Sequence, residues 1–147
     1  MVTIRRVGRA ATVLLIDDNA GVRAGVRALL SGEAALRVVG EANNGRDGLD
    51  RARELRPELI VLDQEMPGLS GVQILPALRL MLPASRVTFF TLSVEVEALA
   101  LALGATAVVA KEEPALLLAT LRRLAAEGGR PAPEVQVPRP PGPHPVR

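Results

Sequence analysis

The sequence predicts an α/β protein in which five parallel strands form a doubly wound sheet flanked by five helices. Short apolar runs alternate along the chain with segments whose apolar residues recur at helical spacing. The runs are apolar without a break, as in residues 59–62, which is typical of strands buried on both faces of a parallel sheet. Polar side chains follow four of the runs directly. Because parallel strands end at one edge of a sheet, these polar residues are candidates for a functional site.

The first half of the chain is expected to contain three strands and two helices. Val22, Val26 and Leu30 share the face of a helix that ends at the Ser-Gly pair after it. The second helix ends before Pro57, since the residue before proline disfavours helical geometry. In order, we expect a strand over 13–16, a helix over 22–30, a strand over 36–40, a turn over 41–45, a helix over 46–56 and a strand over 59–62.

The second half is expected to contain two strands and three helices. Pro114 follows two acids and is suited to the first turn of the last helix, whose core stripe is Leu117, Leu121 and Leu124. In order, we expect a helix over 72–80, a strand over 87–90, a short apolar helix over 95–103, a strand over 107–110 and the last helix up to the glycine pair at 128–129.

The chain is expected to hold one domain between two segments that lack core patterning. Residues 1–11 are basic and without periodicity, so they are interpreted as a flexible leader. Seven of the twenty residues from Gly128 onward are proline, which predicts a disordered tail over 128–147. The domain therefore spans residues 12–127.

The composition indicates a folded protein and excludes several classes of site. Nearly half of the 147 residues are apolar, enough for one domain with its own core. The chain has no cysteine, so neither a disulfide nor a thiolate metal site can form. No apolar run approaches the roughly 20 residues that span a bilayer, and no signal-peptide pattern follows the N-terminal arginines. We therefore expect a cytoplasmic protein that makes no membrane contact.

The basic residues are almost all arginine. The net charge is +2, and the isoelectric point is near 10.3 because seventeen of the eighteen basic residues are arginine. They are spread along the chain without a clustered stripe, so we expect no direct nucleic-acid binding. The single lysine, Lys111, is a compact point charge where arginine would be a wide planar fork. Its presence suggests a position that cannot accept arginine; chance is the alternative.

Residues from four strand ends are expected to converge on one edge of the sheet. They are Asp17 and Asp18 after the first strand, Asp63 after the third, Thr91 after the fourth and Lys111 after the fifth. Three crowded carboxylates repel one another and favour a cation, and an oxygen-only donor set suits Mg²⁺. A lysine and a hydroxyl beside such an ion form a receptacle for a phosphoryl group, with Asp63 as the nucleophile.

At these motifs the chain resembles the receiver domains of two-component response regulators. The matching segments are Leu-Leu-Ile-Asp-Asp at 14–18, Leu-Asp-Gln-Glu-Met-Pro-Gly at 62–68, Thr91 and Lys111, in that order. Gly-Glu-Ala-Asn-Asn-Gly at 40–45 and Gly-Ala at 104–105 are similar to receivers of LuxR-type DNA-binding regulators. The resemblance covers about residues 12–126 and implies a flavodoxin-like or CheY-like fold with strand order 2-1-3-4-5.

The resemblance also implies a chemical role for each acid. Asp63 would accept a phosphoryl group from a sensor histidine kinase or a phosphotransfer protein. Mg²⁺ would be held directly by Asp18 and Asp63, by the backbone carbonyl of Glu65, and by Asp17 through water. The implied protein is a phosphoacceptor in signal transduction that switches an output protein. It is not an enzyme, apart from self-catalysed phosphorylation and dephosphorylation.

Further implied roles concern the switch. Thr91 would turn toward the phosphoryl group and Lys111 would pair with it, while Glu65 and Ser93 occupy positions that tune the lifetime of the phosphorylated state. The family usually has an aromatic residue shortly before the lysine, but here Val108 takes that place and the chain has no Tyr or Trp. The interval from Thr91 to Lys111 is also shorter than in related receivers, so the resemblance does not imply a relay from threonine to an aromatic residue.

Several alternatives stay open. The apolar helix over 95–103 is either a surface for a homodimer or partner, through the 94–127 face, or a more buried helix. No periodicity for a helix-turn-helix follows Gly128, so the chain is either a stand-alone receiver or the input half of a LuxR-type DNA-binding regulator. A degenerate receiver with altered output is a third possibility. A phosphohydrolase of the haloacid dehalogenase type also uses Asp, Mg²⁺, Thr and Lys, but the residue two after Asp63 is Glu65 and not Asp.

Overall fold

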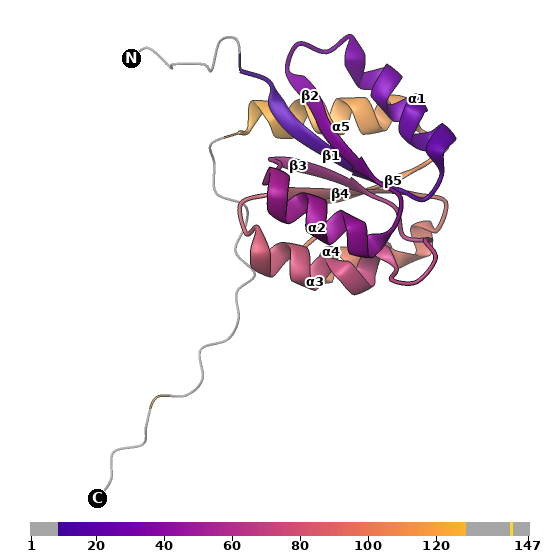
Figure 1. Ribbon diagram of the computed structural model, residues 1–147, viewed down its shortest axis with the longest axis vertical. Coiled ribbons are helices and arrows are strands. Elements are labelled where there is room, and N and C mark those ends of the chain that lie inside the picture. Colours follow the sequence, from indigo (N-terminus) through magenta and orange to yellow (C-terminus); the bar gives the residue numbers. More distant parts are fainter. Residues whose placement is uncertain (1–8, 129–141, 143–147) are drawn as a thin grey trace, which may run out of the picture.

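Five parallel strands form one sheet with helices on both faces (Figure 1). The computed structural model describes residues 9–128 and 142. Most of the expected leader over 1–11, and nearly all of the proline-rich tail over 128–147, therefore lie outside the described residues. The strands are β1 (Ala11–Ile16), β2 (Leu36–Ala42), β3 (Leu59–Leu62), β4 (Arg86–Thr91) and β5 (Ala107–Ala110). Their order β2-β1-β3-β4-β5, with every pair parallel, confirms the predicted fold.

Two layers of helices cover the sheet (Figure 1). Helices α1 (Ala20–Ser31) and α5 (Pro114–Ala126) pack on one face. Helices α2 (Gly45–Leu55), α3 (Gly71–Met81) and α4 (Glu97–Ala102) pack on the other. These helices bury both faces of the central strands, and successive side chains of a strand point to opposite faces. Thus Leu14 and Ile16 lie in the core under α2 and α3, whereas Val13 and Leu15 lie under α1 and α5.

Several boundaries differ from the sequence-based expectation, and three of them concern the leader or the candidate site. Strand β1 begins at Ala11, a residue assigned to the leader. Strand β2 runs on to Ala42, because Ala42 is buried and pairs with Ile16, so the predicted turn starts two residues too early. Thr91 is the last residue of β4 and pairs with Ala110, so it lies inside the sheet and not after it.

The expected helix over 95–103 is shorter and more irregular than predicted. A 3₁₀ turn, η1 (Val94–Val96), precedes α4, which ends before Gly104 at φ 103°. Ala100 is fully buried, but Leu99 and Leu101 are 52% and 43% exposed. The interpretation of this segment as a more buried helix is therefore wrong for these two leucines.

The last helix agrees with its predicted pattern, since its residues Leu117, Leu121 and Leu124 are all buried. Among the described residues, no helix has the length and apolarity needed to cross a bilayer.

Candidate functional site

The five candidate side chains all emerge at the carboxyl edge of the sheet. Backbone hydrogen bonds extend the ladder past the strand ends, since Asp63 N donates to Ile16 O at 2.9 Å and Lys111 N donates to Thr91 O at 3.0 Å. The sheet itself therefore places β1, β3, β4 and β5 so that their terminal side chains meet.

Three carboxylates crowd together at this edge. Asp17, Asp18 and Asp63 each offer an oxygen, and these oxygens lie within 4.8 Å of one another. Asp17 and Asp63 are buried, with 5% and 3% of their surface exposed, whereas Asp18 is exposed. We call these three residues the acid trio. Its oxygen donors fit a hard divalent cation such as Mg²⁺, which prefers one or two carboxylates and keeps waters on its open side.

Lys111 bridges two members of the acid trio. Its Nζ lies 2.9 Å from Asp17 Oδ2 and 3.1 Å from Asp63 Oδ2, and 13% of the side chain is exposed. Burial lowers the pKa of Lys111, but the hydrogen bonds and charges of the two carboxylates outweigh it and leave that pKa above its usual value. The ammonium is therefore charged and fixed between the two acids.

The charge of the site remains incompletely balanced. Burial is the largest cause that raises the pKa of Asp63, and the charge of Asp17 raises it further. Hydrogen bonds from Lys111 and Thr91 act in the opposite direction but do not cancel the rise. One ammonium thus does not compensate the buried carboxylates, and a further cation would favour the ionised form of Asp63.

Thr91 belongs to a chain of contacts that reaches the loop after β3. Its side chain is fully buried, and its Oγ1 accepts a hydrogen bond from Ser93 N at 3.0 Å. Ser93 Oγ donates to Glu65 Oε1 at 3.0 Å. The side chains predicted to tune the site, Glu65 and Ser93, therefore contact each other and join the loops after β3 and β4.

Gly71 supports Asp63 in a way that the sequence analysis missed. A Cβ on Gly71 would lie 2.5 Å from the backbone oxygen of Asp63 and 2.7 Å from the ring of Phe89. Gly71 N donates to Gln64 O at 3.0 Å, and Val72 N donates to Gln64 Oε1 at 2.9 Å. The start of α3 thus packs directly against the loop that carries Asp63. A glycine just after the loop was the available signal.

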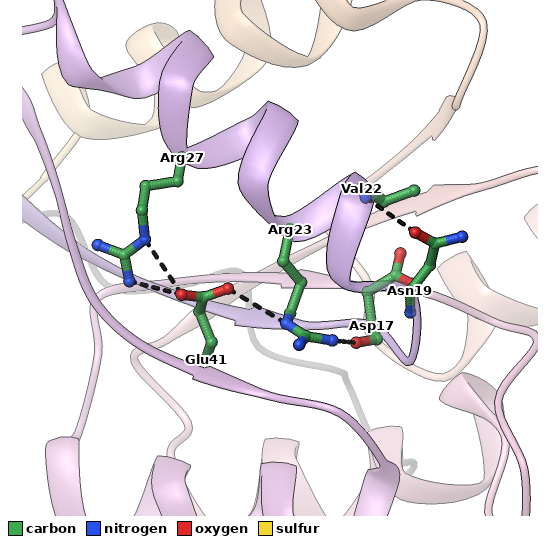
Figure 2. Close-up of polar contacts among 6 residues, drawn as sticks. All are labelled: Asp17, Asn19, Val22, Arg23, Arg27 and Glu41. Carbon is green, nitrogen blue, oxygen red and sulfur yellow. Dashed lines mark hydrogen bonds and ion pairs between the residues drawn. The ribbon is translucent and has the colours of Figure 1, made fainter.

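Arg23 was also missed as a site residue. Its NH1 donates to the backbone oxygen of Asp17 at 2.6 Å, and its Nε donates to Glu41 Oε1 at 3.1 Å (Figure 2). Its contact with Asp17 depends on how β2 and α1 pack, which no local pattern in the sequence reveals.

Val108, which stands where the family usually has an aromatic residue, is half-buried in β5. It packs against the core cluster that also includes Ala100 and Phe89.

Comparison with known proteins supports the resemblance to receiver domains. Residues 13–122 match the family model described as the response regulator receiver domain. The nitrate/nitrite response regulator protein NarL of Escherichia coli K12 is 42% identical over 119 residues, covering 79% of this chain and 55% of that protein. The chain therefore spans about half the length of the curated relatives that it matches first.

Solved structures show the same likeness. The receiver domain of the putative response regulator NarL from Mycobacterium tuberculosis gives a TM-score of 0.74 at 28% identity, covering 82% of this chain and 98% of that one. A LuxR-family two-component response regulator from Aurantimonas sp. SI85-9A1 gives 0.74 at 30% identity, covering 81% and 87%.

Proposed function

The chain belongs to the response regulator receiver family, and from this membership we propose that Asp63 is its phosphoacceptor. Receiver domains of this family act in two-component signal transduction. The observation that carries the proposal is the position of Lys111, whose Nζ contacts the carboxylates of both Asp17 and Asp63. A fixed ammonium beside a buried carboxylate suits transfer of a phosphoryl group to that carboxylate.

The transfer step uses the carboxylate of Asp63 as nucleophile. One of its oxygens attacks the phosphorus of the donor, the bond from phosphorus to the donor breaks, and an acyl phosphate forms on Asp63. Lys111 then pairs with the phosphoryl oxygens, and the Thr91 hydroxyl donates a hydrogen bond to them. The donor group leaves with the electron pair of the broken bond.

Receiver domains bind Mg²⁺ at an acidic pocket. In this chain Asp18 and Asp63 would hold the ion directly, Asp17 would hold it through water, and the backbone carbonyl of Glu65 would be a further ligand. The bound ion would supply positive charge that offsets the charge on the transferring oxygens. The protein's own part is to hold the three carboxylates together against their repulsion.

The proposed partners follow from the same site. A sensor histidine kinase or a phosphotransfer protein supplies the phosphoryl group, and an output protein responds. The family is generally non-enzymatic, so we propose a phosphoacceptor and no turnover of small phosphomonoesters. Membership of the receiver family therefore favours a phosphoacceptor over a phosphohydrolase of the haloacid dehalogenase type. We also propose that the receiver domain comprises the predicted residues 12–127 together with Ala11, where β1 begins, between the leader and the proline-rich tail, and that the protein is cytoplasmic.

The output surface is assigned to the 94–127 face, where a homodimer or an output partner would dock. Its exposed apolar side chains are Val94, Leu99, Leu101 and Leu116, with Leu92 at its edge. Exposed apolar groups of this kind mark interaction surfaces. Because Val108 replaces the aromatic residue, we propose that Thr91 acts on this surface through Ser93 and the η1 turn.

A titration with Mg²⁺ and beryllofluoride, followed by amide NMR, tests this output route. We expect shifts of residues 94–103 on titration, and none in the Asp63→Asn variant. An unresponsive 94–103 segment beside a responsive acid trio would instead indicate a degenerate receiver with altered output.

We propose no direct DNA contact by this chain, although related regulators are DNA-binding. Several of its arginines are engaged by carboxylates, including Arg9 with Glu58, Arg27 with Glu41 and Arg122 with Glu33. A gel shift with the purified chain should give no retarded band at physiological salt. A specific band would favour the input half of a LuxR-type regulator with its own DNA contact.

Phosphorylation by acetyl phosphate tests the main proposal. With Mg²⁺ present, we expect one phosphoryl group per chain that is stable in acid and labile in base, detected by intact mass. Asp63→Asn should abolish it, whereas Asp50→Asn, on the exposed face of α2, should not. Equal labelling of the Asp63→Asn variant would refute the assignment.

A further inference from the structure

Arg23 connects the acid trio to the neighbouring strand β2. Its guanidinium donates to two acceptors at once, the backbone oxygen of Asp17 at 2.6 Å and Glu41 Oε1 at 3.1 Å (Figure 2). Only 17% of the Arg23 side chain is exposed. The planar fork of arginine suits such paired acceptors, and lysine cannot reproduce its geometry.

Glu41 is itself held from the other side. Its Oε2 accepts hydrogen bonds from Nε and NH2 of Arg27 at 3.1 and 2.8 Å (Figure 2). Arg23 and Arg27 lie one turn apart on α1, and Glu41 lies near the end of β2. The carboxylate of Glu41 therefore bridges the two guanidinium groups. Within residues 9–128, Arg27 contacts Glu41, the partner of Arg23, but not Asp17.

The backbone oxygen of Asp17 matters because its peptide unit leads directly into Asp18. The carboxylates of Asp17 and Asp63 are held by Lys111, and Asp17 Oδ1 also accepts a hydrogen bond from Asn19 N at 2.9 Å. Asp18 is the exposed member of the trio. Its direction is set by its backbone, so a hydrogen bond that fixes the preceding carbonyl also limits where Asp18 can point.

We propose that Arg23, braced by Glu41, is a positioning residue that holds the Asp17–Asp18 peptide so that Asp18 joins Asp17 and Asp63 around a divalent cation. The inference rests on the proposed cation site and assigns to it a residue outside the acid trio. The guanidinium of Arg23, which contacts the backbone oxygen of Asp17, also brings a positive charge close to the acid trio. This charge partly offsets the repulsion among the carboxylates of the trio. Residues that orient metal ligands typically change metal affinity by about 10- to 100-fold when they are lost.

The test measures Mg²⁺ affinity of the unphosphorylated full chain by amide NMR titration with MgCl₂. Arg23→Met keeps most of the apolar stem and removes the guanidinium, and we expect its Mg²⁺ dissociation constant to rise about tenfold. The matched control is Arg27→Met, which loses contacts to the same Glu41 and should change affinity less than twofold. Arg23→Lys, which keeps a charge and a donor, should recover part of the affinity.

The amide of Asp18 gives a second readout that does not require the ion. It should shift in Mg²⁺-free Arg23→Met and stay in place in Arg27→Met. Should Arg23→Met unfold, Glu41→Gln tests the same brace with a smaller change and should weaken Mg²⁺ binding by a lesser factor.

Two outcomes overturn the inference. One is unchanged Mg²⁺ affinity in both Arg23→Met and Glu41→Gln; the other is an equal loss in Arg23→Met and Arg27→Met. If acetyl phosphate still labels Asp63 in those cases, the proposed function stands while the role of Arg23 fails. If the parent chain neither bound Mg²⁺ nor was labelled by acetyl phosphate, both the proposed function and the role of Arg23 would fail.

Discussion

The contacts of Lys111 depend on the small size and the single point charge of its ammonium group. Its ammonium fits between single oxygens of Asp17 and Asp63, at 2.9 and 3.1 Å. The lone lysine in an arginine-rich chain suggested such a position, with chance as the alternative. The two contacts favour the first explanation, because a point charge can serve both oxygens where a planar fork is too wide.

Replacing this lysine by arginine separates the two explanations. We expect Lys111→Arg to fold and to lose at least about tenfold in the initial rate of phosphorylation by acetyl phosphate, because the ammonium no longer meets the transferring oxygens. Intact-mass time courses measure the rate, with Arg122→Lys, at an exposed position of α5, as the control. A Lys111→Arg variant that labels as fast as the parent chain would mean that lysine occurs there by chance.

The pKa of Asp63 leads to a prediction about stability. In the unfolded chain this carboxyl has its ordinary pKa of 3.8, and in the folded chain burial and the charge of Asp17 raise that pKa. The folded state therefore binds this proton more tightly. The stability from this group is fully present below pH 3.8 and is lost as the pH rises through the raised pKa. At neutral pH the ionised carboxylate is a net cost.

Asp63→Asn should consequently unfold at a higher temperature than the parent chain at pH 7 in Mg²⁺-free buffer. The difference should shrink as the pH is lowered toward the ordinary aspartate pKa, because the parent carboxyl then becomes neutral too. Far-UV circular dichroism measures both melting curves, which suits a chain without Tyr or Trp. A lower melting temperature for Asp63→Asn at pH 7 would show that Lys111 outweighs burial.

At the scale of elements, most strands and helices follow from apolar patterning. The strands over 59–62 and 107–110 have the predicted bounds because each is a short apolar run between turn residues. Strand β2 was predicted too short because its last residues, Glu41 and Ala42, join the sheet through pairing with β1, which no local pattern reveals. The contact of Arg23 with Asp17 was missed for the same reason.

The contact between α3 and the Asp63 loop gives a prediction at this scale. Gly71→Ala should lower the free energy of unfolding by roughly 1–3 kcal/mol, since its Cβ would overlap the Asp63 carbonyl and the Phe89 ring. The matched change Gly25→Ala, at an exposed position of α1 with nothing within 4 Å of the new Cβ, should instead add about 0.5–1 kcal/mol. Urea unfolding followed by circular dichroism compares the two, and equal effects would contradict the packing argument.

At the scale of the whole molecule, the strand order brings together residues that are 94 positions apart between Asp17 and Lys111. Sequence analysis predicted this convergence from parallel strand ends. It did not predict which side chains are exposed around the site. Leu99 and Leu101 remain outside the core because only one side of α4 faces the sheet, and that depends on the tertiary fold.

Convergence of the acid trio couples cation binding to folding. Unfolding separates the three carboxylates, so Mg²⁺ binds mainly the folded chain and should stabilise it by about 2.7 kcal/mol at one hundred times its dissociation constant. We expect the melting temperature to rise with MgCl₂ in the parent chain and much less in Asp63→Asn. Sodium chloride at matched ionic strength is the control, because it screens surface ion pairs without filling the site. An equal rise with either salt would argue against a specific cation site.

The most direct test of the account is the chemical position of the phosphoryl group. After reaction with acetyl phosphate and Mg²⁺, sodium borohydride reduces an acyl phosphate on aspartate to homoserine, which peptide mass spectrometry can locate. The account predicts homoserine at position 63 and unmodified aspartate at positions 17 and 18. Homoserine at either of those acids, or its absence from position 63 in a phosphorylated chain, would contradict the central claim.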